Sequence, residues 1–239
     1  MKRLINYVAR KLGYEKINQD KLEIEIATKR WIKSFDINLI FDIGASDGGF
    51  ARKIKKIFPD SAIYCFEPLP KSFKRLTERN SEMNFFFPVN VALSDKTGQM
   101  NFYLCENNTG SSSMLEMNKS HKEAYPHTST NTKMVVNSNT LDLFSKDLDL
   151  TNKNILLKLD VQGAEKIVLE GAADTLKRVD LIFCEMNFTT TYNGCVLFGD
   201  LNNFLEKNGF ILCGIENISQ NKFTGEFLQA DAYFKKIKK

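Results

Sequence analysis

The sequence lacks the features that define several large classes of protein. None of its apolar runs is long enough to span a membrane. The basic start of the chain is followed by polar residues rather than by the apolar core of a secretory signal peptide. No C-x-x-C pair is present, which argues against a zinc site. The five cysteines are odd in number and scattered, mostly in apolar runs, which favours reduced thiols in a cytoplasmic protein.

The body of the chain also lacks an excess of charge of one sign. The 33 basic and 29 acidic residues leave a net charge of +4, and the basic surplus lies at the two ends, in residues 1–16 and 235–239. The rest of the chain is slightly acidic and does not resemble a basic groove, so we expect no nucleic-acid partner. Solvated termini are the simplest interpretation of the basic ends, and weak attraction to a membrane surface is the alternative.

The length and composition predict one large α/β domain with a full core, since 43% of the 239 residues are hydrophobic. Helical spacing of apolar residues predicts helices over 3–14 and 20–35. The first is basic and amphipathic, so it either lies on a membrane or packs on its own domain or on a partner subunit, as in a homodimer. The second has as candidate buried positions Leu22, Ile26, Trp31, Ile32 and Phe35. Residues 1–37 are therefore expected to form a helical cap before a main domain over 38–239.

The chain is organised around residues 39–50, LIFDIGASDGGF. An apolar run typical of a strand buried on both faces is followed at once by a glycine turn and the start of a helix. Glycines allow positive φ and close approach of a ligand, and a helix N-terminus presents free N–H donors beside it. These features predict a binding site for a nucleotide-type ligand.

Two acids in or beside this turn, Asp42 and Asp47, indicate which nucleotide is bound. The glycine spacing departs from the G-x-G-x-x-G of dinucleotide sites. Carboxylates beside a pyrophosphate would be repulsive, whereas they suit a ligand with an amino group and a sulfonium. We therefore predict S-adenosylmethionine as the cofactor, with an NAD-dependent oxidoreductase as an alternative.

The next two predicted strands add further candidate cofactor residues. The strand 61–66 ends in Glu67, which is placed to accept hydrogen bonds from both ribose hydroxyls. The third strand, 85–93, ends before Ser94 and Asp95. Asp95 is a candidate partner for the adenine amino group, with Ala92 and Leu93 packing on the ring. A local turn formed by Ser94 and Asp95 is an equally good interpretation.

A polar stretch over residues 106–131 is long for a connection in a compact domain and is predicted to be a lid or insertion loop. If it covers the cofactor, His121, Tyr125 and His127 are candidates to meet the acceptor. For any one of them, an ordinary residue of a mobile surface loop is the simpler interpretation. Extended segments are expected on either side, over 98–105 and from 133 to 136, followed by a short helix over 140–148.

The second informative stretch is residues 155–165, ILLKLDVQGAE, a buried strand that ends in charged residues. By strand alternation Lys158 and Asp160 point to the same side, near the edge where open α/β sheets bind their ligands. Asp160 is the first candidate for a general base, a metal ligand or an acceptor for the substrate hydroxyl. Lys158 is a candidate to tune Asp160 or to position the acceptor. A structural Lys158–Asp160 ion pair is the alternative.

The following strand, 181–185, also ends in an acid, Glu185, which with Asn187 is assigned to the acceptor side. A divalent metal held by Asp160, Glu185 and Asn187 is a variant mechanism that we do not favour; oxygen ligands of this kind suit magnesium or calcium. A helix over 201–208 and two late strands, 210–215 and 230–234, are expected to close the sheet as a hairpin.

Five segments of this chain together resemble the FkbM family of S-adenosylmethionine-dependent methyltransferases: FDIGASDGGF, CFEP, VALSD, LLKLDVQGAEKIVLEGA and a strand ending in CEMNF. The resemblance covers roughly residues 39–188. It implies a Rossmann-like class I methyltransferase fold, an α/β fold with a seven-stranded, mostly parallel sheet, the last strand antiparallel and helices on both faces. It also implies O-methylation of a hydroxyl on a sugar, glycan or small natural product.

The predicted site combines the residue patterns with this resemblance. On the acceptor side the resemblance also implies Glu165. The predicted catalytic residues are Asp160, Lys158, Glu185 and His121. The predicted cofactor contacts are Asp42, Gly44, Ala45, Ser46, Gly48, Glu67, Pro68, Ala92, Leu93, Ser94, Asp95 and Asp160. The sequence has no D-P-P-Y or N-P-P-Y segment, which argues against methylation of DNA base amines. A non-catalytic adenosylmethionine-binding protein is a second alternative.

Overall fold

The computed structural model describes residues 19–125, 128 and 131–237 and forms two compact units, residues 1–36 and 37–239. The predicted helix over 3–14, His127 and the last two lysines lie outside the described residues. In the first unit, α2 (Gln19–Lys33) confirms the second predicted helix. The expectation that Ile26 is buried in it is wrong, because 48% of this residue is exposed.

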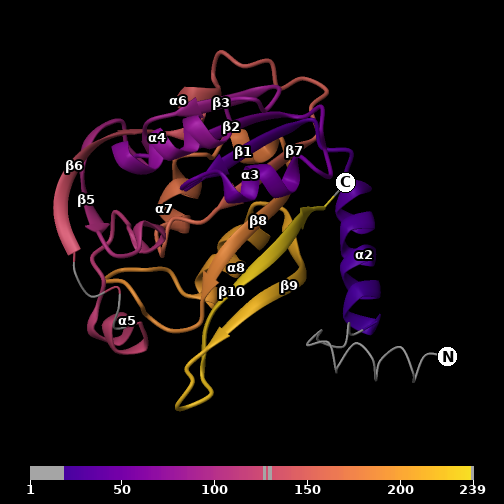
Figure 1. Ribbon diagram of the computed structural model, residues 1–239. Helices are drawn as coiled ribbons and strands as arrows, with labels where there is room; N and C mark the ends of the chain where they lie inside the picture. Colours follow the sequence, from indigo (N-terminus) through magenta and orange to yellow (C-terminus); the bar gives the residue numbers. More distant parts are fainter. Residues whose placement is uncertain (1–18, 126–127, 129–130, 238–239) are drawn as a thin grey trace, which may run out of the picture. The chain divides into compact units, whose positions relative to one another are not determined.

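The second unit contains the predicted seven-stranded sheet, with the strand order β3-β2-β1-β7-β8-β10-β9 (Figure 1). The strands β3, β2, β1, β7 and β8 run parallel, and β10 is antiparallel to both of its neighbours. The predicted sheet with an antiparallel last strand is therefore confirmed. The strand bounds are β1 Leu39–Ile43, β2 Ala62–Phe66, β3 Phe86–Val89, β7 Ile155–Leu159, β8 Val179–Asn187, β9 Phe210–Gln220 and β10 Phe227–Lys236.

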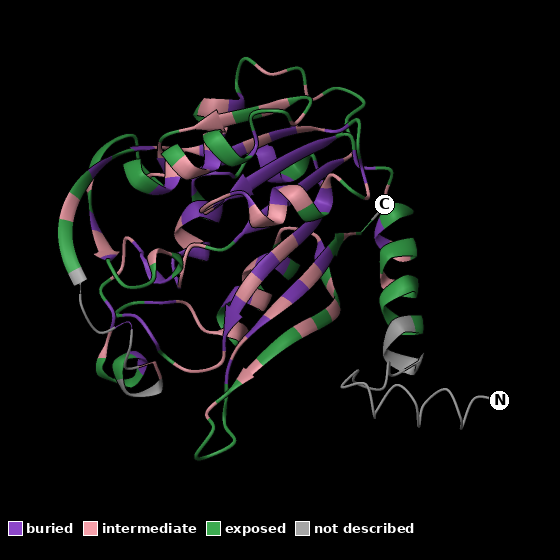
Figure 2. Cartoon of the chain, viewed as in Figure 1, coloured by how far each residue is buried: buried purple, intermediate pink, exposed green. Residues whose placement is uncertain are grey.

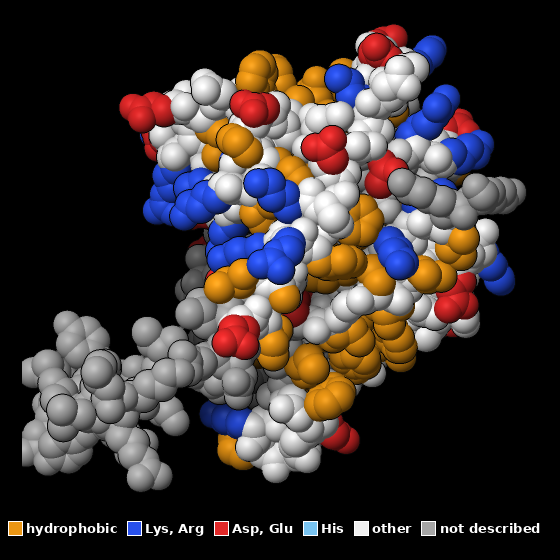
Figure 3. All heavy atoms as spheres, turned by 90° about the vertical axis from the view of Figure 1, so that its right-hand side faces the viewer, with side chains coloured by type: hydrophobic (Ala, Val, Ile, Leu, Met, Phe, Trp, Pro, Cys, Tyr) orange, Lys and Arg blue, Asp and Glu red, His pale blue; other side chains and the backbone are white. Residues whose placement is uncertain are grey.

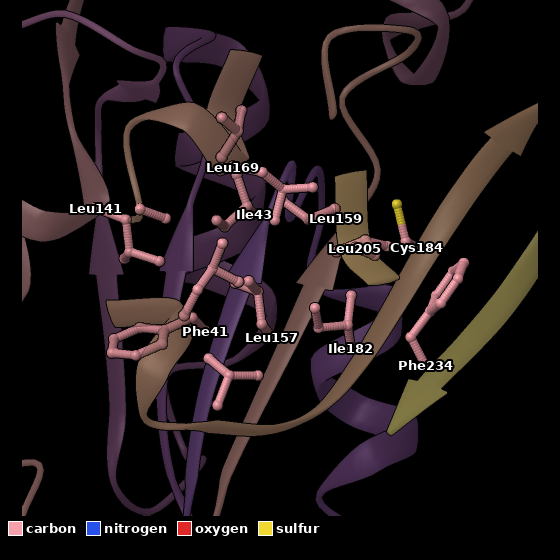
Figure 4. Packing of buried hydrophobic residues seen from close by; sticks show 14 of the residues in the cluster. Phe41, Ile43, Leu141, Leu157, Leu159, Leu169, Ile182, Cys184, Leu205 and Phe234 are labelled. Atoms are coloured by element: carbon pink, nitrogen blue, oxygen red, sulfur yellow. The ribbon is translucent and has the colours of Figure 1, made fainter. Parts of the chain in front are cut away.

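The centre of the sheet is formed by β1 and β7, in which every residue is buried (Figure 2). Parallel strands covered on both faces need such continuous apolar runs. Figure 4 shows Phe41, Leu157, Ile182 and Phe234, from β1, β7, β8 and β10, in a row along one face of the sheet. Each of the four is fully buried, so this row forms the middle of the core.

Helices connect the strands largely where the sequence predicts them. Their bounds are α3 Gly49–Ile54, α4 Pro70–Arg79, α6 Leu141–Ser145, α7 Glu165–Glu170 and α8 Phe198–Lys207. Pro70, rather than Pro68, occupies the first helical position of α4, as expected. Thr140 caps α6, since its side chain accepts a hydrogen bond of 3.1 Å from the N–H of Leu143. The helix predicted over 201–208 begins three residues earlier, at Phe198.

The predicted third strand is wrong in one respect, because residues 85–93 form two strands in different sheets. β3 (Phe86–Val89) joins the large sheet, while β4 (Ala92–Leu93) joins a three-stranded sheet of order β4-β6-β5. β5 (Gly98–Cys105) and β6 (Asn131–Asn139) pair antiparallel over their whole length, on the left of Figure 1. The chain bends between β3 and β4, where the N–H of Val91 donates to the carbonyl of Val89.

The long polar stretch between β5 and β6 contains regular structure where it is described. It forms the 3-10 turn η1 (Thr109–Ser111) and the helix α5 (Lys119–Ala124). Ser113 pairs with Tyr103 of β5, and its hydroxyl donates to the carbonyl of Gln162 over 2.9 Å. The N–H of Asn118 donates to the carbonyl of Thr191. This stretch is therefore tied to the segments that follow β7 and β8, and its role as a lid stays a prediction.

The predicted C-terminal hairpin is confirmed, and its two strands are longer than expected. β9 lies at the edge of the sheet, and Figure 3 shows hydrophobic side chains gathered over the lower part of the face on this side. Exposed large hydrophobic residues of the hairpin are Ile211, Ile215, Ile218, Phe223 and Phe227. The homodimer stays a prediction. None of the helices in the described ranges has the length and apolar character needed to cross a bilayer.

Candidate active site

A cavity opens at the carboxyl ends of β1, β2 and β7, where open α/β sheets bind ligands. Its empty volume is about 560 Å³, a figure that includes the open mouth. Apolar walls come from several segments, among them Phe66, Phe102 and Met114. The predicted cofactor residues that line the cavity are Gly44, Ser46, Glu67, Pro68, Ala92, Leu93 and Asp160.

The other predicted cofactor residues lie around this cavity rather than in its lining. Ala45 and Ser94 are buried, and the Ser94 hydroxyl donates to the carbonyl of Lys96. Asp95 is exposed and lies 3.6 Å from the ammonium of Lys96. The Ser94–Asp95 segment thus makes the local contacts of a turn. Contact of Ala45, Ser94 and Asp95 with a cofactor stays a prediction.

Gly44 brings the ends of β1 and β7 together. Its φ is +75°, and a Cβ atom at this position would lie 1.9 Å from the carbonyl oxygen of Asp160. A side chain here would meet both strain and a backbone clash. The glycine is therefore needed for the close approach of the two strand ends.

The other end of the glycine turn is held by a polar cluster that the sequence did not indicate. Gly48 has a φ of +82°, and a Cβ there would lie 2.3 Å from Nδ2 of Asn80, at the end of α4. This amide donates to the carbonyl of Asp47 over 3.1 Å. The Asp47 carboxylate forms ion pairs with Arg52 and Arg79. Burial opposes ionisation of Asp47, but the two arginines outweigh it and lower the pKa of this carboxyl.

Asp42 and Lys158 form a buried ion pair between the two central strands. The Lys158 ammonium lies 3.0 Å from Asp42 and 3.8 Å from Asp160, so the closer carboxylate is Asp42. The ammonium also donates to the carbonyls of Ile43 and Gly44, over 3.2 and 2.8 Å. Asp42 is 0% exposed and Lys158 is 4% exposed, and neither lines the cavity. In this structure the pair positions the glycine turn, while direct contact of either residue with a ligand stays a prediction.

Burial acts against both charges of this pair. It raises the pKa of Asp42, although the charge of Lys158 opposes the rise. Burial alone would lower the pKa of Lys158, but the charges of Asp42 and Asp160 raise it above its ordinary value. Each residue therefore depends on the other to keep its charge inside the sheet.

Glu67 lies at the end of β2 and is 5% exposed. Its two carboxylate oxygens accept hydrogen bonds of 2.9 Å from the N–H groups of Ser46 and Leu69. Burial raises the pKa of this carboxyl to about 7, against the effect of the two N–H donors. A carboxylate has about four acceptor positions, so about two remain for the hydroxyl groups of a ligand.

A cluster of carboxylates and amides lies at the ends of β7 and β8. Asp160 lines the cavity, and 46% of its side chain is exposed. Nε2 of Gln162 donates to Asp160 over 2.9 Å and to Glu185 over 3.1 Å. Nε2 of Gln229, in β10, donates to Glu185 over 2.8 Å and to Asn187 over 3.2 Å. The amides thus hold the two predicted acids in fixed orientations.

Gln162 was not among the residues that the sequence singled out, yet the structure places it between the two predicted acids. It has a φ of +57°, a left-handed conformation that is costly for a side chain other than glycine and is typical of functional sites. Its Oε1 accepts a hydrogen bond of 2.9 Å from the hydroxyl of Tyr192. Its sequence position after Val161, in the turn that follows β7, was the signal that could have identified it.

The two glutamates of this region have raised pKa values. Burial raises the pKa of Glu185 well above its ordinary value, and the charge of Asp160 adds to the rise. Glu165 is fully buried, and burial raises its pKa to about 7. One oxygen of Glu165 accepts from the N–H groups of Val161 and Gly163, over 3.1 and 3.2 Å. Glu165 therefore shapes the turn before α7.

His121 lies in α5 outside the lining of the cofactor cavity. It is 2% exposed, its Nε2 is 3.0 Å from the hydroxyl of Thr128, and its ring lies 4.9 Å from that of Tyr192. Its predicted catalytic role stays a prediction. Within the ranges that the structure describes, no three His, Cys, Asp or Glu side chains form a group suited to a metal ion, and the metal variant also stays a prediction.

The fold and the site together define a class of protein. A doubly wound sheet carries a glycine turn after its first strand and an acid with unused acceptor positions after its second, both facing one cavity. This combination is typical of α/β proteins that bind a nucleoside-containing ligand. Residues 42–212 match the family model described as the methyltransferase FkbM domain, and the chain belongs to this family.

Two curated relatives are methyltransferases by name. The 2-O-methyltransferase NoeI of Sinorhizobium fredii is 28% identical over 161 residues, which are 65% of this chain and 66% of that protein. The hexuronic acid methyltransferase AglP of Haloferax volcanii is 25% identical over 151 residues, which are 63% of this chain and 56% of that protein. The matched region thus spans just under two thirds of the length of NoeI and somewhat over half of the length of AglP.

Proposed function

We propose that this protein transfers a methyl group from S-adenosylmethionine to a hydroxyl group of a sugar, a glycan or a small natural product. The observation that carries the proposal is the single cavity that joins Glu67, with its unused acceptor positions, to the half-exposed carboxylate of Asp160. Membership of the FkbM family supports the choice of cofactor. The names of the two relatives, which refer to 2-O- and hexuronic acid methylation, support a sugar hydroxyl as acceptor.

The residues of the cavity fit this cofactor. Glu67 is placed to accept hydrogen bonds from the ribose hydroxyls, and Ala92, Leu93 and Phe102 offer apolar surface to the adenine. Gly44 lines the cavity without a side chain, which allows close approach of a ligand to the backbone. When bound, S-adenosylmethionine supplies an electrophilic methyl group, which the acceptor oxygen receives in an in-line displacement as the carbon–sulfur bond breaks and its electron pair stays on sulfur.

The chain itself contributes positioning and proton transfer. Holding donor and acceptor in line supplies much of the rate enhancement of such a displacement. Asp160 accepts the proton that the acceptor hydroxyl loses as its oxygen forms the new bond to carbon. Gln162 orients the Asp160 carboxylate by donating to Oδ1, and Oδ2, which lies 3.8 Å from the Lys158 ammonium, is the oxygen that takes that proton.

The test of the cofactor is calorimetric titration of the folded protein with S-adenosylmethionine, S-adenosylhomocysteine and NAD. We expect micromolar binding of the first two and none of NAD. Binding of NAD alone would contradict the proposal and favour an oxidoreductase. Binding of the cofactor with no transfer to any hydroxyl compound would favour a non-catalytic adenosylmethionine-binding protein.

The affinity for S-adenosylhomocysteine is expected to fall as the pH drops below 7. Because the pKa of Glu67 is raised to about 7, this carboxyl holds its proton below that pH and loses acceptor positions for the ribose. If only the ionised form binds, affinity should fall about tenfold between pH 8 and pH 6. Calorimetry across this range measures the effect.

The variant Glu67→Gln separates this effect from the titration of other groups. We expect it to bind weakly at every pH and to lose the pH dependence that is specific to Glu67. Glu78→Gln, the same change at an exposed position of α4, should bind like the unmodified protein. An identical pH profile in the Glu67→Gln variant would contradict the role of Glu67 in cofactor binding.

A further inference from the structure

A second hollow opens beside the cofactor cavity, and Gly110 lines both. Its empty volume is about 740 Å³ including the open mouth. We propose that this acceptor hollow binds the ring of an uncharged sugar and discriminates against uronic acids and other anionic sugars. The inference rests on the proposed methyl transfer and specifies its acceptor. The side chains used in the argument are Asn108, Tyr125, Thr128, Gln162 and Gln229.

The position of the hollow connects it to the proposed base. Gln162 lines the hollow, and its Nε2 donates to Asp160, which lines the cofactor cavity. A sugar that contacts Gln162 is thus one side chain away from the carboxylate that takes its proton. The two cavities therefore have the arrangement that transfer between a bound donor and a bound acceptor needs.

The amide groups of the hollow are oriented so that acceptor atoms remain available. The two Nε2 protons of Gln229 are used by Glu185 and Asn187. Those of Gln162 are used by Asp160 and Glu185, and its Oε1 faces the Tyr192 hydroxyl, which shares its one proton between this oxygen and the carbonyl of Ser111. The carbonyl oxygen of Gln229 and the second lone pair of the Gln162 carbonyl oxygen are left as acceptors.

Such a wall favours a ligand rich in hydroxyl donors. A neutral sugar offers an O–H donor at most of its ring positions, whereas an ionised carboxylate offers only acceptors. The acids Asp160 and Glu185 lie directly behind the two amides. Among the described residues that line the hollow none is a lysine or arginine, and the nearby Lys158 is paired with Asp42 inside the sheet. The one histidine of the lining, His121, has its Nε2 against the Thr128 hydroxyl. A carboxylate in the hollow would therefore meet the amide acceptors and, behind them, the carboxylate of Asp160.

The rings and hydroxyls of the opposite wall complete a surface suited to a sugar. The phenol of Tyr125 lies 2.7 Å from the hydroxyl of Ser219, which fixes its ring at the edge of the hollow. Thr128 and Asn108 also line this space, and the Thr128 hydroxyl donates to the carbonyl of Tyr125. An aromatic ring beside amides and hydroxyls offers the mixed apolar and polar contacts that the faces and edges of a sugar ring require.

The test measures methyl transfer by the full chain to a panel of methyl glycosides, with each neutral hexoside or deoxyhexoside paired with the corresponding uronide. We expect kcat/KM for the neutral members to exceed that of their uronides by about a hundredfold or more. This comparison uses the unmodified protein and depends on no variant. Equal or faster methylation of the uronides would overturn the proposal.

A variant tests whether the hollow is the site of this selectivity. Gln229→Met keeps the length of the side chain and removes its amide, and we expect it to raise the KM for a neutral glycoside about tenfold. Its affinity for S-adenosylhomocysteine should stay unchanged, which also shows that it is folded. Gln220→Met makes the same change at an exposed position of β9 and should leave both values unchanged. An unaltered KM in Gln229→Met would overturn the assignment.

The outcomes separate this inference from the proposed function. If S-adenosylhomocysteine binds and no sugar of the panel is methylated, the inference is wrong and the cofactor assignment stands. If S-adenosylhomocysteine does not bind to the folded protein, the proposed function fails and the inference fails with it.

Discussion

Replacing Asp160 by asparagine is expected to lower kcat for methyl transfer by about 10²–10⁴-fold, the usual contribution of a general base. The carboxylate lies in the cavity with 46% of its side chain exposed, and its Oδ2 is 3.8 Å from the Lys158 ammonium, which is too far for a strong hydrogen bond and leaves this oxygen able to accept a proton. Asparagine keeps the shape and the hydrogen bond from Gln162 but accepts no proton at neutral pH. Steady-state kinetics with the best acceptor of a glycoside panel measures the effect.

The control for Asp160 has two parts. Binding of S-adenosylhomocysteine should persist in the Asp160→Asn variant, since this product carries no sulfonium charge for the carboxylate to meet. Asp147→Asn, at an exposed position after α6, should leave kcat unchanged. Retention of more than about a tenth of the turnover in Asp160→Asn would show that another group accepts the proton. The variant Glu185→Gln would then test whether the neighbouring carboxyl of Glu185 is that group.

Replacing Lys158 by methionine is expected to lower the free energy of unfolding by about 3–5 kcal/mol, because it leaves the buried carboxylate of Asp42 without its partner. Lys158 is 4% exposed and also donates to two backbone carbonyls at the end of β1. Urea denaturation at pH 7 measures the loss. Lys166→Met, at a half-exposed position of α7, should change the free energy by no more than about 0.5 kcal/mol.

Two further measurements identify the buried charge as the cause. The double variant Lys158→Met, Asp42→Asn should recover part of the lost stability, because an amide carries no charge to desolvate. In Lys158→Met alone, the already raised pKa of Asp42 should rise further. When the pKa of a carboxyl is higher in the folded than in the unfolded protein, the free energy of unfolding falls as the pH rises between these two pKa values. The loss of stability caused by Lys158→Met should therefore become smaller as the pH is lowered. A deficit below about 1 kcal/mol at pH 7 would contradict this account.

The parts of the fold that the sequence predicted correctly are those with a local pattern. The strands β1 and β7 appear in the sequence as short apolar runs, and β1 is followed directly by glycines. The starts of α4 and α6 were indicated by Pro70 and Thr140, whose effect on the helix depends only on neighbouring residues. Resemblance to a family added the number of strands in the sheet and the antiparallel last strand, which no local pattern contains.

The third strand shows where local pattern fails. Residues 85–93 form one apolar run, yet Val89 pairs with β2 while Ala92 pairs with β6. The hydrophobic pattern indicates that both segments are extended, although only β4 is fully buried. It does not show which neighbour each segment pairs with, because pairing is decided by residues far along the chain.

In the candidate site, too, local sequence identified some residues, while the partners of others depend on the fold. The sequence singled out Glu67 and Asp160, which directly follow strands, and the structure places both in one cavity. It also singled out the charges of Asp42 and Lys158, but their partners depend on the parallel register of β1 and β7, in which these two residues stand side by side. Because of that register, the two residues predicted to contact a ligand or acceptor form an ion pair with each other inside the sheet.

The sequence by itself determined the family, the buried strands and the glycine turn, because each depends on the types and spacing of neighbouring residues. Only the tertiary structure decided that Gln162 links Asp160 to Glu185, that Tyr192 orients this amide, and that a second hollow lies beside the first. These contacts join β7, β8 and the segment before α8. Hydrogen bonds act over about 3 Å, so they exist only after folding has brought such distant segments together.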